Sequence, residues 1–220
     1  MYGEYQDAAY SNVSLVAASP GRPRSEPTRR AILAASLAAV EEEGYARLTM
    51  EGLARRAGVS KQTIYRWWPT KAGVVLEALI EGARRAAPQR ETGSFEADLR
   101  HLVRDTVSAA RASVAVLSAL MAESQLDERF GRDFREGFLA GRRAVLREVI
   151  ARGRERDQVS EDADPDILIE LVFGMLWYRI LTRHAPLNRR FADQLTAAVL
   201  ALASPSSRDE REAVAAGVEA

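Results

Sequence analysis

One segment constrains the fold of this chain more than any other: it runs from Thr49 to Lys71 and reads TMEGLARRAGVSKQTIYRWWPTK. Its pattern predicts two short helices. Gly58 is expected to end the first, because glycine adopts the left-handed backbone that a helix end often requires. Pro69 is expected to end the second, because proline lacks an N–H and disfavours helical geometry in the residue before it. The segment therefore predicts two helices joined by a glycine turn.

Hydroxyl side chains stand where the helices of this segment should begin. Thr49 and Ser60 can accept hydrogen bonds from the free backbone N–H groups of a first turn, and Thr70 can do the same for a third helix. The three predicted caps indicate a helix-turn-helix followed directly by a longer helix.

The second helix has two different faces. Ile64 and Trp68 share one side of it, whereas Gln62 and Arg66 stand four residues apart on another. One side can pack against the protein while the other reads a partner. A helix-turn-helix delivers its second helix into the DNA major groove, so this arrangement favours DNA binding.

The stretch Gly58–Lys71 closely resembles the recognition segment of the TetR-type (tetracycline-repressor-like) transcriptional regulators, and the resemblance extends over about residues 28–76. A weaker resemblance links Phe173–Leu187 and Phe191–Leu195 to the last two helices of one TetR C-terminal subfamily. The resemblance implies an all-α chain with an N-terminal three-helix helix-turn-helix DNA-binding domain and a C-terminal helical ligand-binding and dimerisation domain. It also implies a homodimeric repressor that binds double-stranded operator DNA and responds to a small-molecule effector.

Candidate DNA contacts gather on the second helix. Gln62 favours adenine and Arg66 favours guanine by two-point hydrogen bonding. Trp67 can lie against a thymine methyl or pack against the following helix, and the resemblance implies phosphate contacts for Tyr65 and Lys71. Arg66, Trp67 and the next tryptophan replace the histidines and phenylalanine of many relatives, which changes the expected operator but not the docking. The predicted DNA-binding residues are Thr49, Ser60, Lys61, Gln62, Thr63, Tyr65, Arg66, Trp67, Lys71, Arg22 and Arg24.

Charge is segregated along the chain. Residues 22–71 hold ten Lys or Arg against five Glu, a net charge of plus five, while the whole chain sums to zero. Attraction to phosphate should therefore concentrate in the N-terminal part. Arg22 and Arg24 form a short basic arm there, which can enter a minor groove or remain a solvated tail.

Composition excludes several classes of protein. The 220 residues are 47% hydrophobic, enough for a sizeable core, and contain no cysteine for disulfides or thiolate metal sites. Apolar runs fall well short of the roughly 20 residues of a membrane helix, and no signal peptide precedes the fold, so we expect a cytoplasmic protein. The two histidines lie far apart, so we expect no metal, cofactor or enzymatic activity. The alternatives are an architectural DNA-binding protein without sequence preference and a helical enzyme.

Helical periodicity continues to residue 203 and no segment alternates with period two, so we expect only helices. Polar residues at 88–93 separate the N-terminal part from the rest. The predicted helices cover residues 27–43, 70 onward, 94–112, 114–123, 129–156, 165–184 and 188–203. The predicted organisation is a disordered lead (1–20), a helix-turn-helix domain (21–76), a helical ligand-binding and dimerisation domain (77–203) and a flexible tail (204–220).

The last two predicted helices carry more apolar surface than one partner helix needs. Pairing them with their copies across a two-fold axis would form a four-helix interface, and a palindromic operator would require the same symmetry. Packing inside a monomer is the alternative. The predicted interface residues are Leu168, Leu171, Val172, Met175, Leu176, Arg179, Leu195 and Val199.

Overall fold

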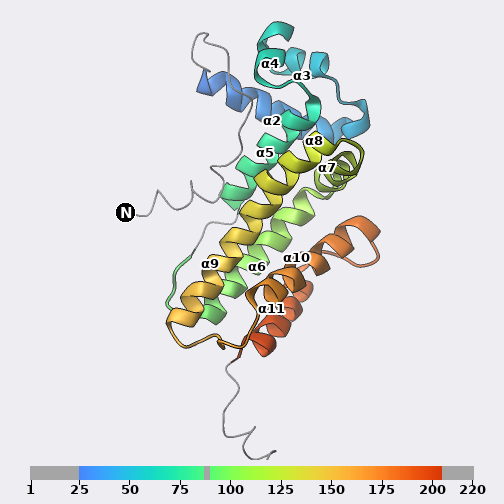
Figure 1. The fold of residues 1–220 in the computed structure, drawn as a ribbon. Helices are drawn as coiled ribbons and strands as arrows, with labels where there is room; N and C mark the ends of the chain where they lie inside the picture. The colour runs from blue at the N-terminus through green and yellow to red at the C-terminus, as the bar shows by residue number, and fades with distance from the viewer. Residues whose placement is uncertain (1–24, 87–89, 205–220) are drawn as a thin grey trace, which may run out of the picture. The chain divides into compact units, whose positions relative to one another are not determined.

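A computed structural model describes residues 25–86 and 90–204, and every regular element in those ranges is helical (Figure 1), which confirms the all-α prediction. The predicted lead, Arg22, Arg24 and residues 205–220 of the predicted tail lie outside the described residues. The first elements are α2 (Glu26–Glu43), η1 (Tyr45–Arg47), α3 (Met50–Arg56), α4 (Lys61–Trp67) and α5 (Lys71–Ala86). The later elements are α6 (Phe95–Ala112), α7 (Val114–Leu126), α8 (Glu128–Asp133), η2 (Phe134–Leu139), α9 (Ala140–Glu155), α10 (Pro165–Thr182) and α11 (Arg189–Ala203).

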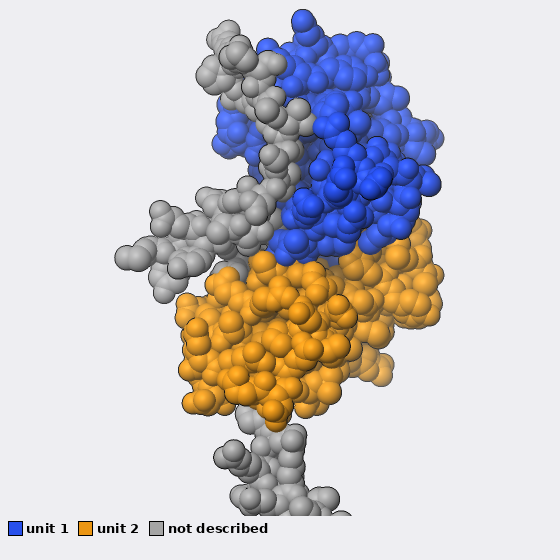
Figure 2. Space-filling view, viewed as in Figure 1, with its two compact units in different colours: residues 1–88, 109–142 blue, residues 89–108, 143–220 orange. Residues whose placement is uncertain are grey.

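The chain divides into two compact units, which Figure 2 colours separately. The first holds residues 1–88 and 109–142, and the second holds residues 89–108 and 143–220. Helices α6 and α9 therefore contribute residues to both units. The predicted boundary between the DNA-binding domain and the ligand-binding domain, after residue 76, falls within α5. The assignment of these two functions to the two sides of that boundary stays a prediction.

The helix-turn-helix of the first unit closes as its sequence predicts. Gly58 has a φ of +65°, and the N–H groups of Gly58 and Val59 donate to the carbonyls of Arg55 (3.3 Å) and Ala54 (2.9 Å). This is the Schellman arrangement, in which a left-handed residue satisfies the last free carbonyls of a helix. The turn between α3 and α4 is thereby set by backbone hydrogen bonds.

Trp68, the residue after α4, anchors the helix-turn-helix to α5. Its side chain is 1% exposed, and its indole N–H donates to a carboxylate oxygen of Glu77 at 2.7 Å. The other oxygen of Glu77 accepts from Arg29 of α2 at 3.0 Å, and Arg29 also donates to Glu81 at 3.0 Å. A part-buried polar network therefore joins α2, the end of α4 and α5.

The helix predicted over residues 129–156 is present from Glu128 to Glu155, but it contains a π-helical segment, η2, that the sequence did not predict. The rings of Phe130, Phe134 and Phe138 stack in sequence, with centroids 6.2 Å and 5.6 Å apart. A π-turn holds more residues than an α-turn, so η2 returns Phe138 to the side of the helix that carries the other two rings. All three rings are buried.

Most residues of the predicted dimer interface are buried within the second unit itself. Leu168, Val172, Leu176, Leu195 and Val199 are each at most 5% exposed, so they form the core of one protomer. Arg179 also serves the protomer: its guanidinium lies 3.8 Å from the Phe191 ring centroid and donates to the Pro186 carbonyl. Leu171 is half-buried, and Met175 is 41% exposed. Most of these side chains therefore pack inside one protomer, and their part in a dimer interface stays a prediction.

We expect Glu77→Ala to lower the free energy of unfolding by about 2 kcal/mol, because it leaves the buried Trp68 indole N–H without its acceptor. Urea denaturation followed by tryptophan fluorescence measures the change. The matched control is Glu42→Ala, which removes a 59% exposed carboxylate paired with Arg56 and should cost less than about 1 kcal/mol. Equal losses in the two variants would contradict a special role for the Trp68–Glu77 bond.

Candidate nucleic-acid interface

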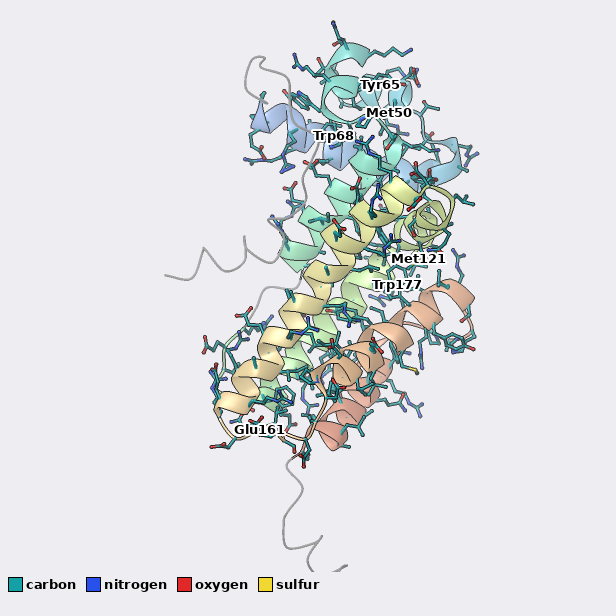
Figure 3. All side chains as sticks on the ribbon, in the orientation of Figure 1. Met50, Tyr65, Trp68, Met121, Glu161 and Trp177 are labelled. Carbon is teal, nitrogen blue, oxygen red and sulfur yellow. The ribbon has the colours of Figure 1, made fainter. Side chains whose placement is uncertain are left out.

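Helix α4 presents a polar face to solvent. Lys61, Gln62, Tyr65 and Arg66 are exposed, whereas Ile64 on the opposite side is 0% exposed. Ile64 packs inward because it shares a face with the buried helix end, as its spacing predicted. The four polar side chains are therefore brought to one accessible surface (Figure 3 labels Tyr65).

Thr49, Ser60 and Thr63 combine a hydroxyl with a helix start. The Thr49 hydroxyl oxygen accepts from the Gly52 N–H at 3.0 Å, and that of Ser60 accepts from the Thr63 N–H at 3.1 Å. The Ser60 and Thr63 hydroxyl oxygens are also 2.9 Å apart. Both predicted caps are confirmed. Thr49 and Ser60 remain exposed, and a hydroxyl that accepts from a backbone N–H can still donate its own hydrogen to a phosphate oxygen.

Glu51 of α3 holds two residues of the α4 surface. Its carboxylate lies 2.7 Å from Lys61 Nζ and accepts from the Tyr65 hydroxyl at 3.4 Å. The Lys61 ammonium holds the pKa of Glu51 below its usual value, and Glu51 raises the pKa of Lys61 in return. All three side chains are substantially exposed, so the cluster is open to solvent and to exchange of partners.

Lys71 points into the first unit. Its ammonium donates to the carbonyls of Tyr45 at 3.0 Å and Leu48 at 3.1 Å, and it lies 4.5 Å from the Tyr45 ring centroid. These contacts give the carbonyl of Leu48 a donor and the carbonyl of Tyr45 a second one, both from a cation at the start of α5. Lys71 therefore links the start of α5 to the segment around η1 by hydrogen bonds, a structural role that its spacing in the sequence did not indicate.

Trp67 lies in the interior, which favours the packing alternative that the sequence left open. Its side chain is 7% exposed, and its ring meets the Trp68 ring edge-on with centroids 5.6 Å apart. The Arg66 guanidinium lies 6.0 Å from the Trp67 ring centroid. Trp67 therefore supports the position of Arg66 and offers little ring surface to a base.

Metal-binding groups and membrane-spanning helices were also sought among the described residues. No group of three or more His, Asp or Glu side chains is placed to hold a metal ion there. Within the same residues no single helix is long and apolar enough to cross a membrane; α6 and α7 pass that test only as a pair, and the pair is bent.

Two stretches of the chain match known families. Residues 32–78 match the bacterial regulatory proteins of the tetR family, and residues 89–199, half of the chain, match the tetracyclin repressor-like C-terminal domain. The chain belongs to the TetR family. This TetR-family protein is a DNA-binding regulator of transcription and not an enzyme, as the helix-turn-helix and its polar face predicted.

Curated relatives and solved structures agree with this assignment. The HTH-type transcriptional regulator YdeS of Bacillus subtilis is 32% identical over 179 residues, which are 80% of this chain and 89% of that protein. The DNA-binding transcriptional repressor TetR of Mycobacteroides abscessus is 29% identical over 192 residues, 84% of this chain and 98% of that one. The crystal structure of the TetR family transcription regulator SCO0332 superposes with a TM-score of 0.70 at 29% identity, covering 82% of this chain and all of that chain. The similarities extend over both the helix-turn-helix and the later helices.

Glu51 was not among the residues that the sequence predicted to contact DNA. The signal was present, because Glu51 is the only acidic residue between Thr49 and Lys71, a stretch with five basic ones. Its pairing with Lys61 depends on the crossing of α3 and α4, which residue spacing does not specify.

We expect Lys71→Met to lower the free energy of unfolding by about 1–2 kcal/mol, because the partly buried carbonyls of Tyr45 and Leu48 each lose a charged donor. Thermal or urea unfolding followed by circular dichroism measures this. Lys61→Met is the control: that lysine is 63% exposed in a surface pair, and its loss should change stability by less than about 1 kcal/mol. A Lys71→Met protein as stable as the control would contradict the claim that the hydrogen bonds of Lys71 stabilise the fold.

Proposed function

We propose that this TetR-family regulator acts as a homodimer on a palindromic operator, with one copy of α4 in each of two successive major grooves. The observation that carries the proposal is the α4 surface, where Lys61, Gln62, Tyr65 and Arg66 are exposed around a helix held rigid by buried Ile64. One such helix reads only a few base pairs, so two copies about 34–36 Å apart are needed for a specific site. A DNA-binding regulator acts where the chromosome is, so the proposal places the protein in the cytoplasm.

The proposed contacts fall into two classes. Gln62 and Arg66 read base edges, because their amide and guanidinium groups match adenine and guanine in the major groove. Thr49, Ser60, Thr63 and Tyr65 contact phosphates from the helix starts and the side of α4, and Lys61 adds its charge. Such contacts position the protein without reading sequence. Phosphate contact by Lys71, and entry of Arg22 and Arg24 into a minor groove, remain predictions.

We expect Arg66→Ala to lose about 1–3 kcal/mol of discrimination at one base pair of each half-site. DNase protection of fragments flanking the gene identifies the operator, and titration of single-base-pair variants measures the discrimination. Arg132→Ala, which removes an exposed arginine from α8, is the matched control for lost charge and should keep the same preference.

Tyr65→Ala belongs in the same experiment as a phosphate-contact variant, and it should weaken binding to every site without changing the preferred sequence. A wild-type protein that competitor DNA displaces equally from any fragment would contradict the proposal. That outcome would favour the architectural alternative.

The dimer is proposed to form through the face of α10 that its own protomer leaves uncovered. Ile167, Tyr178 and Leu181 are 55%, 57% and 51% exposed. With Leu171 and Gly174 they recur at alternating spacings of four and three, which is the pattern of a seam between helices. On α11 the exposed residues near the end are mostly small, which permits close approach of a second helix. These residues are Ala197, Ala198, Ala201 and Leu202.

We expect Leu181→Glu to weaken the dimer by roughly 100-fold or more, because two-fold symmetry buries the new charge twice. Analytical ultracentrifugation measures the dissociation constant, and operator binding should fall with it. Leu126→Glu is the control, since Leu126 is 85% exposed at the end of α7 outside the proposed seam. Equal association in the two variants would place the interface elsewhere.

The regulator is further proposed to be a repressor released by a small-molecule effector. The relative named TetR is a repressor, and a solved neighbour of the same fold, FadR of Bacillus subtilis, is in complex with stearoyl-CoA at a TM-score of 0.61 and 16% identity. An effector that binds more tightly to a dimer whose two α4 helices are wrongly spaced must release DNA, because the two equilibria are linked. The effector of this chain is to be sought by its effect on operator affinity.

A further inference from the structure

Glu51 lies among the residues proposed to meet DNA, although a carboxylate repels phosphate. It is the only acidic residue between Thr49 and Lys71, and it belongs to the first turn of α3. Its side chain is 46% exposed, as is required of a group at an accessible surface. A role beyond capping the α3 dipole needs a contact with the DNA-binding residues themselves.

That contact exists twice. Glu51 pairs with Lys61 Nζ at 2.7 Å, and it accepts from the Tyr65 hydroxyl at 3.4 Å. Lys61 opens α4 and Tyr65 follows one turn later, so a single carboxylate gathers two donors from the same side of the helix. A DNA phosphate presents the same kind of oxygen acceptor to such donors.

We propose that Glu51 is an internal substitute for a DNA phosphate, which occupies Lys61 and Tyr65 in the free protein and must yield them when DNA binds. The inference rests on the proposed docking of α4. Every DNA sequence has phosphates, so the competition weakens binding to all sequences alike. Base contacts by Gln62 and Arg66 are unaffected by it. The net result is a lower affinity for DNA of any sequence, while the ratio of operator affinity to non-specific affinity is set by the base contacts.

The distribution of charge in the helix-turn-helix supports this role. Arg56 is already paired with Glu42 and Glu43, and Lys71 with backbone carbonyls. Lys61, at the start of α4, is exposed and is paired with one carboxylate, that of Glu51. Its availability to a phosphate therefore depends on Glu51. An exposed pair of this kind contributes little stability and opens readily, so a phosphate can replace its acid partner.

The test compares Glu51→Gln with wild type on two duplexes of equal length, the operator and a scrambled sequence, by fluorescence anisotropy between low and physiological salt. Glu51→Gln should bind the scrambled duplex roughly 3- to 10-fold more tightly at low salt, with a salt dependence steeper by about one released ion. The ratio of operator affinity to scrambled affinity should change little, because the phosphate contacts are common to both duplexes. Thermal unfolding of the variant confirms that α3 is intact.

Three variants distinguish the effect of the contact between Glu51 and Lys61 from the effect of net charge on DNA affinity. Glu41→Gln removes an exposed carboxylate of α2 and controls for net charge, so it should change affinity less than Glu51→Gln. Glu51→Asp keeps the charge but shortens its reach toward Lys61, and it should give an intermediate gain. In a Lys61→Met background, Glu51→Gln should gain less than it does in wild type, because only the Tyr65 hydroxyl is then released.

Other results overturn the inference. Weaker binding of both duplexes by Glu51→Gln would mean that Glu51 orients Lys61 and Tyr65 for contact. A loss confined to one operator base pair would mean that Glu51 reads a cytosine amino group. A gain equal to that of Glu41→Gln would mean that only net charge matters. Failure of wild type to prefer its operator would overturn the proposed function itself, whereas a specific wild type with an unchanged Glu51→Gln overturns the inference alone.

Discussion

Helix α4 is seven residues long, too short to hold its conformation alone in water, so its position depends on contacts at its two ends. At its start, the left-handed Gly58 closes α3 and the Ser60 hydroxyl caps α4. At its end, Trp68 is buried and bonded to Glu77 of α5. Because both ends are held by other elements, α4 can leave four polar side chains in solvent. The surface that meets DNA is therefore a consequence of packing elsewhere in the first unit.

The net charge of the helix-turn-helix overstates the number of basic side chains that are available to bind DNA phosphates. The segment from Thr49 to Lys71 carries five basic residues, yet three of them have partners within the protein. Lys71 serves the carbonyls of the η1 turn, Arg56 serves two carboxylates of α2, and Lys61 serves Glu51. Only contacts at exposed positions can be exchanged for phosphate at small cost, because partly buried cations lose hydrogen bonds that DNA does not replace. Such a surface therefore binds phosphate more weakly than its net charge alone would indicate.

The apolar helices of the second unit show how one sequence pattern can serve two interfaces. Helix α10 is apolar on most of its circumference, and the structure assigns one side to the core with α11 and leaves another uncovered. Residues one position apart, such as Ile167 and Leu168, have opposite environments, 55% and 1% exposed. In an amphipathic helix the periodicity of apolar residues predicts which side is buried. In a helix that is apolar nearly all round, periodicity gives no such prediction. The proposed seam follows from exposure and could not have been chosen from composition.

Local rules of the sequence determined the helical class, the caps at Thr49, Ser60 and Thr70, the glycine turn and the proline stop, because these depend on neighbouring residues alone. The resemblance of residues 28–76 determined the family. Tertiary structure decided whatever depends on how helices meet. It turned Trp67 and Lys71 inward, placed Glu51 beside Lys61, inserted a π-turn at Phe134–Leu139, and divided the apolar residues of α10 between core and surface. Those outcomes are set by the crossing of elements distant in sequence, and residue spacing within one helix carries no information about that crossing.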